Sequence, residues 1–374
     1  MTKQAISAER SLFAALAGRE RDEGMELAIV GSFTTPDRRG NGRGIEVFRR
    51  NSRDEWHGVC GLPMPNPSYL LLDERSSSIF VAHGALGMVS ALRLDREIGA
   101  LGRINEQQLG GTNPVHLAIS PDGGHLLVVA YTSGNLIALP IMENGALGPA
   151  SASLELPGAP GPNTSEQRGS HPHQIVVDPT GRWLIVPDKG LDKVFTIAFD
   201  PATPSFSIVS EYIAKPGSGP RHAAFHPNGS TVYVDNEMGG TVSQFVFDGH
   251  SGSLTLVGSQ ATLPEDYSGP NATSEMQLSP CARSLFVANR GHDSIVRFGV
   301  DAVTGALSVA ESWVATGGAW PRCMTLGPKG DELYVANQDG NNIMSFALSA
   351  SETLVERRLV VETGSPSSIV FAGP

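Results

Sequence analysis

A proline-framed repeat runs through the chain and limits what it can fold into. A typical copy opens with a proline, continues into a short apolar run and reaches a second proline seven residues later. Four copies carry both prolines, namely Pro114/Pro121, Pro172/Pro179, Pro220/Pro227 and Pro321/Pro328. A second apolar run follows each Pro-x-Gly turn, and most copies add a third run and a weaker fourth. Turns between short apolar runs predict antiparallel strands, so each copy is expected to form a small sheet.

The copies recur with opening-to-opening spacings of 45 to 58 residues. Their openings are residues 66–84, 113–132, 171–190, 219–239, 273–291 and 320–340, with a last single strand at 365–371. Four short antiparallel strands at this period are typical of a β-propeller blade. The last copy supplies one strand, and residues 26–33 begin without an opening strand, so the two ends complete one blade. The sequence therefore predicts an all-β, seven-bladed propeller of four-stranded antiparallel blades, closed by pairing the N- and C-terminal strands.

No linker or change in composition separates the copies, so residues 25–374 are expected to form a single domain. Residues 1–24 precede the first strand as an extension, whose apolar residues have the spacing of one amphipathic helix, namely Leu12, Phe13, Leu16 and Ala17. Two longer polar loops, residues 158–170 and 265–274, are either lips over one end of the central channel or simple connections.

Charged residues make up only 17% of the chain, and the net charge is −11. Nucleic-acid binding over a broad face needs clustered Lys and Arg, so this composition argues against it and leaves room for a local basic pocket. The cysteines, Cys60, Cys281 and Cys323, have no metal-ligand spacing and suit reduced thiols in the cytosol. No apolar run approaches membrane-spanning length and no signal peptide is evident. We expect a cytoplasmic protein with no membrane contact, as a monomer or a weak homodimer.

Two positions of the repeat are expected to meet at one rim of the ring. Antiparallel pairing places the start of the first strand beside the end of the second, and the first strand is innermost in a propeller. The first position is the residue after the opening one, and in successive copies it is Ser68, Val115, His173, Arg221, Thr273 or Ser274, and Arg322. The second position lies two residues after the Val-Ala pair, and in successive copies it is Gly84, Thr132, Lys189, Glu237, Arg290 and Gln338. A structural turn would repeat Gly, Asn or Asp. Ionisable residues here therefore indicate a site for a small anion.

The arginines at these positions also have a structural interpretation. Arg221, Arg290 and Arg322 suit rim ion pairs with Glu237 or Asp188, which contribute little individually. Three convergent arginines with one or two local carboxylates leave positive charge over, which favours an anionic ligand. Glu237 itself lies within DNEMGG, where a turn acid is the alternative interpretation.

The other candidates have similar alternatives. His171 and His173 flank Pro172, and either can cap the end of a strand. His222 follows Arg221 within the first strand, where a structural and a binding role are equally supported. Lys189 is the member of the group best interpreted as merely solvated.

The repeat N/H/G-P-x-x-x-x-x-x-P-x-G, followed by L-Y/F-V-A-N, resembles the seven-bladed lactonase family. That family includes the propeller-type 6-phosphogluconolactonases and the 3-carboxy-cis,cis-muconate lactonizing enzymes, and the resemblance extends from about residue 26 to the end of the chain. In the muconate lactonizing members, a His, a Glu and two Arg at these blade corners are proposed as the active site. The matching residues are His173, Arg221, Glu237 and Arg290, with the same 16-residue step from Arg221 to Glu237. In the lactonase members, the same mouth is taken to bind the sugar lactone.

The residue types define a mechanism for opening a lactone. His173 can titrate near neutrality and act as the base toward water, or Glu237 can do so if partial burial raises its pKa. Arg221 and Arg290 would face the carbonyl oxygen and the acid group of the ligand. Further substrate-binding residues are expected to be His171, Lys189, His222, Arg322 and Gln338. No His/Asp/Glu set has clear metal-ligand spacing and no G-x-S-x-G is present, so neither a metal, a cofactor nor a serine nucleophile is expected.

Three functions follow from these residues. The leading hypothesis is hydrolysis of a small anionic sugar lactone, with 6-phosphogluconolactone as the first candidate. The second is cyclisation of 3-carboxy-cis,cis-muconate, in which His173 or Glu237 protonates a carbon as a carboxylate closes the ring. The third is a non-catalytic propeller that binds a ligand or a partner.

Overall fold

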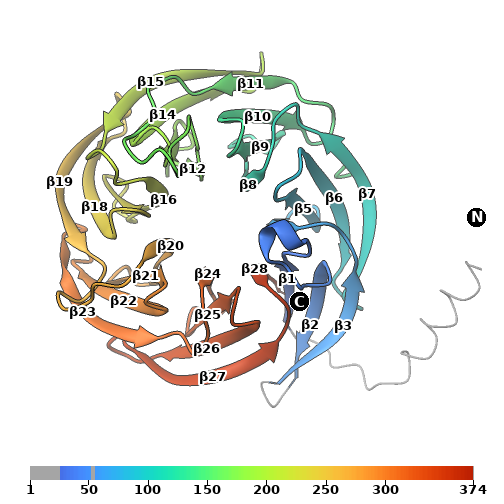
Figure 1. Cartoon of the computed structure of the whole chain (residues 1–374). Coiled ribbons are helices and arrows are strands. Elements are labelled where there is room, and N and C mark those ends of the chain that lie inside the picture. The colour runs from blue at the N-terminus through green and yellow to red at the C-terminus, as the bar shows by residue number, and fades with distance from the viewer. Residues whose placement is uncertain (1–25, 52–54, 374) are drawn as a thin grey trace, which may run out of the picture.

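The computed structural model describes residues 26–51 and 55–373, which form seven four-stranded antiparallel sheets arranged as a ring (Figure 1). The extension predicted over residues 1–24 lies outside the described residues. The innermost strands are β4 (Pro67–Asp73), β8 (Pro114–Ile119), β12 (Val176–Val177), β16 (Pro220–Phe225), β20 (Ala272–Leu278), β24 (Pro321–Leu326) and β28 (Pro366–Ala372). The predicted seven-bladed propeller is confirmed.

The ring closes through the two ends of the chain, as the repeat predicts. Strand β1 (Leu27–Ser32) pairs antiparallel with β28, and Leu27 lies opposite Ala372. The same sheet continues outward through β2 (Ile45–Arg50) and β3 (Trp56–Leu62). The C-terminal strand therefore takes the innermost place in a blade whose other strands come from the N-terminal part.

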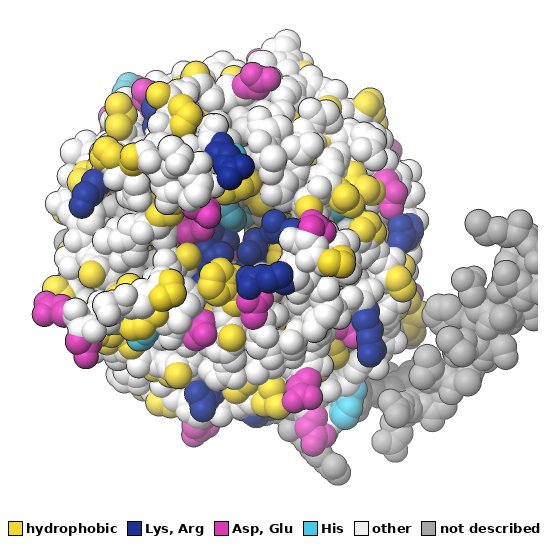
Figure 2. All heavy atoms as spheres, in the orientation of Figure 1, with side chains coloured by type: hydrophobic (Ala, Val, Ile, Leu, Met, Phe, Trp, Pro, Cys, Tyr) yellow, Lys and Arg dark blue, Asp and Glu magenta, His cyan; other side chains and the backbone are white. Residues whose placement is uncertain are grey.

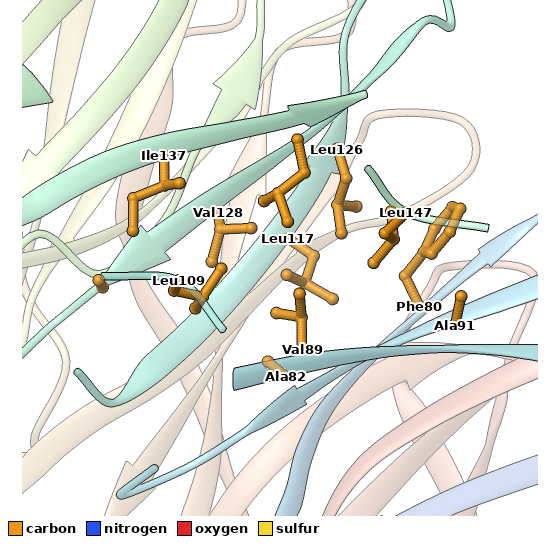
Figure 3. Packing of buried hydrophobic residues seen from close by; sticks show 12 residues of the cluster. Phe80, Ala82, Val89, Ala91, Leu109, Leu117, Leu126, Val128, Ile137 and Leu147 are labelled. Atoms are coloured by element: carbon orange, nitrogen blue, oxygen red, sulfur yellow. The ribbon is translucent and has the colours of Figure 1, made fainter. Parts of the chain in front are cut away.

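The second strand of each blade is almost wholly buried. These strands are β1, whose range is given above, β5 (Ser78–His83), β9 (His125–Ala130), β13 (Leu184–Asp188), β17 (Thr231–Asn236), β21 (Ser284–Arg290) and β25 (Glu332–Asn337). They read as continuous apolar runs because neighbouring blades cover both faces of each sheet. In Figure 3, Phe80 and Ala82 of β5 face Leu126 and Val128 of β9 across one such contact. Each fully buried leucine or phenylalanine stabilises the ring by roughly 1.5–3 kcal/mol.

The outer strands are progressively more exposed. The third strands are β2, given above, β6 (Met88–Asp95), β10 (Asn135–Pro140), β14 (Lys193–Asp200), β18 (Thr241–Asp248), β22 (Ser294–Val300) and β26 (Asn342–Leu348). The fourth strands are β3, given above, β7 (Ala100–Gln108), β11 (Ala152–Glu155), β15 (Ser205–Ile213), β19 (Ser253–Ala261), β23 (Leu307–Ala315) and β27 (Leu354–Glu362). A short 3-10 helix, η1 (Pro36–Arg38), joins β1 to β2 and lies on the inner side of its blade in Figure 1. Across the described residues, no helix has the length and hydropathy needed to cross a membrane.

A β-bulge recurs near the start of the innermost strands. The pairing with the second strand shifts register between Pro67 and Tyr69, between Pro114 and His116, and in the same place in β16, β20 and β24. A bulge sets two residues of one strand against one of its partner, so it breaks the normal alternation of side chains. Two consecutive side chains of a strand can then face the ring axis, and this positions the site.

Candidate functional site

The two repeat positions lie at the same rim of the ring. The start of each innermost strand pairs with the end of the second strand, as in Pro220 opposite Asn236 and Ala272 opposite Arg290. Figure 2 shows Lys and Arg side chains gathered around the central opening, with His side chains beside them. A cavity of ≈ 20 Å³, about the room for one water, is lined by Ser68, Tyr69, Val115, His173, Arg221, His222, Arg322 and Ser367. Consecutive pairs such as Arg221 and His222 line it together, which is the effect of the bulge.

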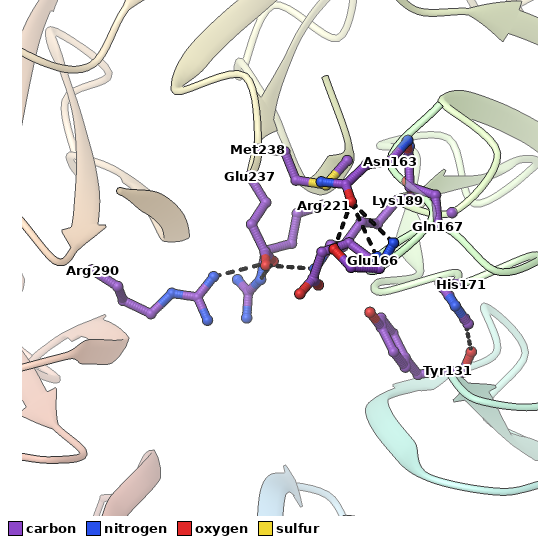
Figure 4. A network of polar contacts seen from close by, with 12 residues as sticks. Tyr131, Asn163, Glu166, Gln167, His171, Lys189, Arg221, Glu237, Met238 and Arg290 are labelled. Carbon is purple, nitrogen blue, oxygen red and sulfur yellow. Dashed lines mark hydrogen bonds and ion pairs between the residues drawn. The ribbon is translucent and has the colours of Figure 1, made fainter. Parts of the chain in front are cut away.

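Glu237 is the centre of a buried cluster of charges (Figure 4). Its Oε1 lies 2.8 Å from Nζ of Lys189. Its Oε2 lies 3.0 Å from Nε of Arg221 and 3.1 Å from Nη2 of Arg290. Three cations from three blades thus meet one carboxylate, and all four residues are buried. The structure therefore brings together three of the four residues that the family resemblance singles out.

The cluster fixes the charge of Glu237. Burial alone would raise the pKa of this carboxyl group, but Arg290, Lys189 and Arg221 outweigh it and hold the pKa far below its ordinary value. Glu237 is therefore ionised at any physiological pH. Such a carboxylate is too weak a base to activate water, and its effect here is to hold the two arginines and the lysine in place.

Lys189 is buried, which differs from the expectation of a solvated lysine. Besides Glu237, its Nζ lies 2.8 Å from Oε2 of Glu166, which belongs to the polar loop 158–170. Burial opposes the charge on Lys189, but Glu237, Tyr131 and Glu166 raise its pKa above the ordinary value. Gln167 of the same loop donates from Nε2 to the backbone oxygen of Lys189 at 2.8 Å. This loop therefore reaches the site and forms a lip.

Arg290 rests on an aromatic ring. Its guanidinium carbon lies 5.5 Å from the ring centre of Trp320, and its Nη2 donates to the backbone oxygen of Thr273 at 2.7 Å. Trp320 has φ 61°, a left-handed conformation that is rare for a bulky residue and that marks local strain. Gln338 directly follows β25 and is buried beside Trp320, whose backbone oxygen accepts from its N–H at 3.0 Å. The Oε1 atom of Gln338 has no hydrogen-bond partner within residues 26–51 and 55–373.

His171 lies away from His173 and contacts Tyr131 instead. The His171 and Tyr131 rings are stacked with centroids 4.6 Å apart, and Nδ1 of His171 lies 2.9 Å from the backbone oxygen of Tyr131. The edge of Tyr131 meets His173, with centroids 5.6 Å apart. Tyr131 thus contacts both histidines, and Figure 4 shows its ring beside His171.

His173 belongs to a line of titratable groups made of two buried imidazoles and one partly buried carboxylate. Its Nδ1 lies 3.2 Å from Nε2 of His222, whose Nδ1 lies 2.8 Å from Oε1 of Glu275. Burial, followed by Arg221, lowers the pKa of both histidines well below the ordinary value, so both are neutral. Burial raises the pKa of Glu275 to about 7, against the opposing effect of Arg221.

Two further arginines face a second aromatic ring. The guanidinium carbons of Arg322 and Arg38 lie 4.9 and 4.5 Å from the ring centre of Phe33. Burial, and then the charge of Arg38, lowers the pKa of Arg322. Neither guanidinium makes an ion pair with a carboxylate among the described residues, whereas the neighbouring Arg39 pairs with Asp339 at 3.1 Å.

Reasoning from the repeat missed several residues of this site, among them Glu275, Tyr131, Glu166 and Arg38. Glu275 follows Ser274 in β20, one position beyond the one considered, and alternation would turn it away from the axis. Tyr131 replaces the Asp or Asn that most copies carry before the second rim position, and this departure was a usable signal. Glu166 and Arg38 lie outside the repeat, in a long loop and in η1, so no repeat pattern could find them.

No group of three or more His, Cys, Asp or Glu side chains that could hold a metal ion occurs in the described part of the chain. All three cysteines, Cys60, Cys281 and Cys323, are free thiols.

Comparisons with known proteins agree with this architecture. A family model described as "Lactonase, 7-bladed beta-propeller" matches residues 27–371. The chain is 27% identical over 325 residues to a 6-phosphogluconolactonase of Bacillus subtilis, covering 86% of this chain and 90% of that protein. It is 32% identical over 361 residues to a 6-phosphogluconolactonase of Formosa agariphila, covering 92% and 99%. A solved structure of the periplasmic gluconolactonase of Pseudomonas aeruginosa is similar with a TM-score of 0.85 and 29% identity, over 94% of this chain and 100% of that one.

Proposed function

The chain belongs to the lactonase family of seven-bladed β-propellers, and from this premise we propose that it hydrolyses 6-phosphogluconolactone to 6-phosphogluconate. The observation that carries the proposal is the positive charge left over at the rim. Glu237 is shared by three cations, and Nη1 of the buried Arg221 has no hydrogen-bond partner among the described residues. A buried guanidinium with a free donor, next to a cavity, favours an oxyanion ligand.

We assign the phosphate group of the substrate to Arg38 and Arg322. Both guanidiniums cover Phe33, and neither has a carboxylate partner in the described part of the chain. Arginine binds phosphate through paired N–H donors, and two arginines match a dianion. Arg322 and His173 both line the central cavity, so we place the phosphate at Arg322 and direct the lactone ring toward His173. This assignment separates a phosphorylated sugar lactone from a neutral one.

The chemistry then follows from the neutral state of His173. Its Nε2 accepts a proton from water as the water oxygen bonds to the lactone carbonyl carbon. Arg221 and Arg290, held by Glu237, stabilise the negative charge that develops on the carbonyl oxygen. When the ring carbon–oxygen bond breaks, the proton on His173 passes to the leaving oxygen, which becomes a hydroxyl group. The new carboxylic acid loses its proton to solvent.

Cyclisation of 3-carboxy-cis,cis-muconate stays the second candidate. Arg221, Glu237 and Arg290 meet within ion-pair distance, and His173 lines the cavity beside Arg221, as the proposed active site of the muconate lactonizing members requires. The names of the relatives favour hydrolysis over this reaction. Binding without catalysis is the third candidate.

The remaining expectations belong to the same proposal. The cations that the reaction needs come from arginine side chains, so we propose that it uses no metal ion. One chain supplies the whole site, which suits a monomer or a weak homodimer. Phosphorylated sugars and reduced cysteines are typical of the cytoplasm, where we place the protein.

One assay tests the proposal. The purified chain is offered 6-phosphogluconolactone, gluconolactone and 3-carboxy-cis,cis-muconate, with and without a metal chelator, beside the double variant His173→Ala, Glu237→Gln. We expect fastest turnover of the phosphorylated lactone, unchanged by the chelator, and its loss in the folded double variant. Turnover of 3-carboxy-cis,cis-muconate alone would establish cyclisation, the second candidate. Turnover of none of the three compounds would favour the third candidate, which is binding without catalysis.

A further inference from the structure

Behind the charge cluster, a carboxylate and two imidazoles form a continuous line, in which both imidazoles are buried and the Glu275 side chain is 16% exposed. Glu275 of β20 contacts His222 of β16 at 2.8 Å, and His222 contacts His173, which precedes β12, at 3.2 Å. His173 is fixed at its backbone as well, because its N–H donates to the oxygen of Pro187 at 3.0 Å. His222 has both ring nitrogens engaged in this line, so it has none left for a substrate.

The hydrogen positions along the line depend on the charge of Glu275. An ionised carboxylate only accepts hydrogen bonds, so Nδ1 of His222 must carry its hydrogen. Because His222 is neutral, its Nε2 is then an acceptor, and Nδ1 of His173 must donate to it. This leaves Nε2 of His173 with a lone pair and no hydrogen. No hydrogen bond engages this nitrogen within the described residues, and the His173 ring lines the cavity.

A protonated Glu275 removes that constraint. Its hydroxyl group can donate to Nδ1 of His222, whose Nε2 then carries the hydrogen and donates to Nδ1 of His173. In this arrangement Nε2 of His173 carries a hydrogen and cannot accept a proton from water. The line therefore has two states that differ in which tautomer of His173 is present.

We infer that Glu275 and His222 are positioning residues, and that ionised Glu275 acts through His222 to hold His173 in the tautomer whose Nε2 accepts the proton of the attacking water. The inference rests on the proposed lactone hydrolysis for its kinetic consequence only. The tautomer itself is a property of the resting protein.

The groups around Glu275 come from three innermost strands. Arg221 and His222 face it from β16, Arg322 and Cys323 from β24, and Tyr69 from β4. Burial raises the pKa of the Cys323 thiol to about 12 and also raises that of the Tyr69 hydroxyl, so both stay neutral. The arginines keep their charge, because a guanidinium is not deprotonated in proteins.

His116 is the remaining imidazole on this side. Its Nε2 lies 2.9 Å from the hydroxyl oxygen of Tyr69, and burial lowers its pKa well below the ordinary value. Among these groups, Glu275 is the one whose pKa, raised by burial, lies at about 7. Since the active form is the ionised one, kcat should rise with pH through about 7.

The decisive experiment compares pH profiles of kcat for the wild type, Glu275→Gln and Glu275→Asp. For the wild type we expect kcat to fall about tenfold for each pH unit below 7. In Glu275→Gln the amide oxygen accepts from His222 at every pH, so this acid limb should disappear. The same variant lacks the charge that stabilises protonated His173, so its kcat at pH 8 should fall about 10- to 100-fold with KM unchanged. Glu275→Asp keeps a titratable carboxyl group, so its pH profile should show part of the acid limb that Glu275→Gln lacks.

Glu352→Gln is the matched control, since Glu352 is a buried glutamate that accepts from Ser279 at 2.7 Å, outside this line of residues. It should leave the profile unchanged. A Glu275→Gln variant with the wild-type profile and kcat would overturn the inference. If the Glu275 variants do not fold, the ¹⁵N chemical shifts of wild-type His173 decide instead. We expect a hydrogen on Nδ1 at pH 8 and a mixture at pH 6, and a hydrogen on Nε2 at pH 8 would contradict the inference. Absence of lactone hydrolysis in the wild type would reject the proposed function and leave this measurement intact.

Discussion

Lys189 and Glu237 occupy the same position of the repeat in consecutive blades, and their side chains form a buried ion pair of 2.8 Å between Nζ and Oε1. Equivalent positions of a propeller come together at one rim because every blade starts and ends its inner strands there. Replacing a turn residue by a cation in one blade and by a carboxylate in the next therefore creates a contact across blades. The same contact holds the arginines that we assign to the substrate.

Glu237→Gln should lower both activity and stability. The substitution leaves Lys189, Arg221 and Arg290 buried around a neutral amide, and removing one partner of a buried ionic cluster costs about 3 kcal/mol or more. We expect a decrease of that size in the free energy of unfolding, measured in urea, and a loss of kcat/KM of about 100-fold. Glu211→Gln is the control, since Glu211 pairs with Lys193 on the exposed outer strands and should change stability by less than about 1 kcal/mol. Equal stability of the two variants would contradict the buried cluster.

The contribution of Glu237 to stability should depend on pH in one direction. Burial is the largest single influence and would raise its pKa, but Arg290, Lys189 and Arg221 together outweigh burial and hold the pKa below the ordinary value. A carboxyl group with a depressed pKa stabilises the fold fully above its unfolded pKa, and this stabilisation is lost as pH falls through the folded value. The difference in unfolding free energy between wild type and Glu237→Gln should thus be constant above about pH 5.5 and shrink below about pH 4. Urea unfolding between pH 3.5 and 8 measures it, and a difference that grows as pH falls would reverse the assigned sign.

Arg38→Gln should change substrate preference more than turnover. Arg38 is assigned to the phosphate group and lies outside the Glu237 cluster, so kcat/KM for 6-phosphogluconolactone should fall about 10- to 100-fold. The value for neutral gluconolactone should stay as in the wild type. Arg39→Gln removes an adjacent arginine that is already paired with Asp339 and should change neither value by more than about twofold. A parallel loss for both lactones in Arg38→Gln would place the phosphate elsewhere.

Gly190→Ala should disturb the lip formed by the loop 158–170. A Cβ atom at Gly190 would lie 1.9 Å from the backbone oxygen of Gly169, so the loop must shift. Glu166 would then lose its contact with Lys189, and we expect a several-fold rise in KM together with a lower melting temperature. Gly258→Ala is the control, because nothing lies within 4 Å of a Cβ at that residue of β19. Unchanged kinetics in Gly190→Ala would show that the lip has no part in substrate binding.

Much of the fold could be predicted from the sequence, because the patterns that specify it are local and recur in each copy of the repeat. The proline pairs, the Pro-x-Gly turns and the short apolar runs recur in each copy, and neighbouring blades can bury these runs only in a closed ring. The unpaired strand at each end then predicts the pairing of β1 with β28, which the structure confirms. Convergence of the two rim positions also follows, since antiparallel pairing alone brings Pro220 beside Asn236.

The tertiary structure alone decided which side chains beyond these positions join the site. The bulge in the innermost strands turns His222 and Glu275 toward the axis, although strict alternation would direct them away. Burial of Lys189 depends on the loop 158–170 folding back over it, and the placement of Arg38 depends on η1. The chain thus determines the ring and its rim through short-range patterns, whereas the partners and charge states of the site depend on contacts between distant blades and loops, which no local pattern encodes.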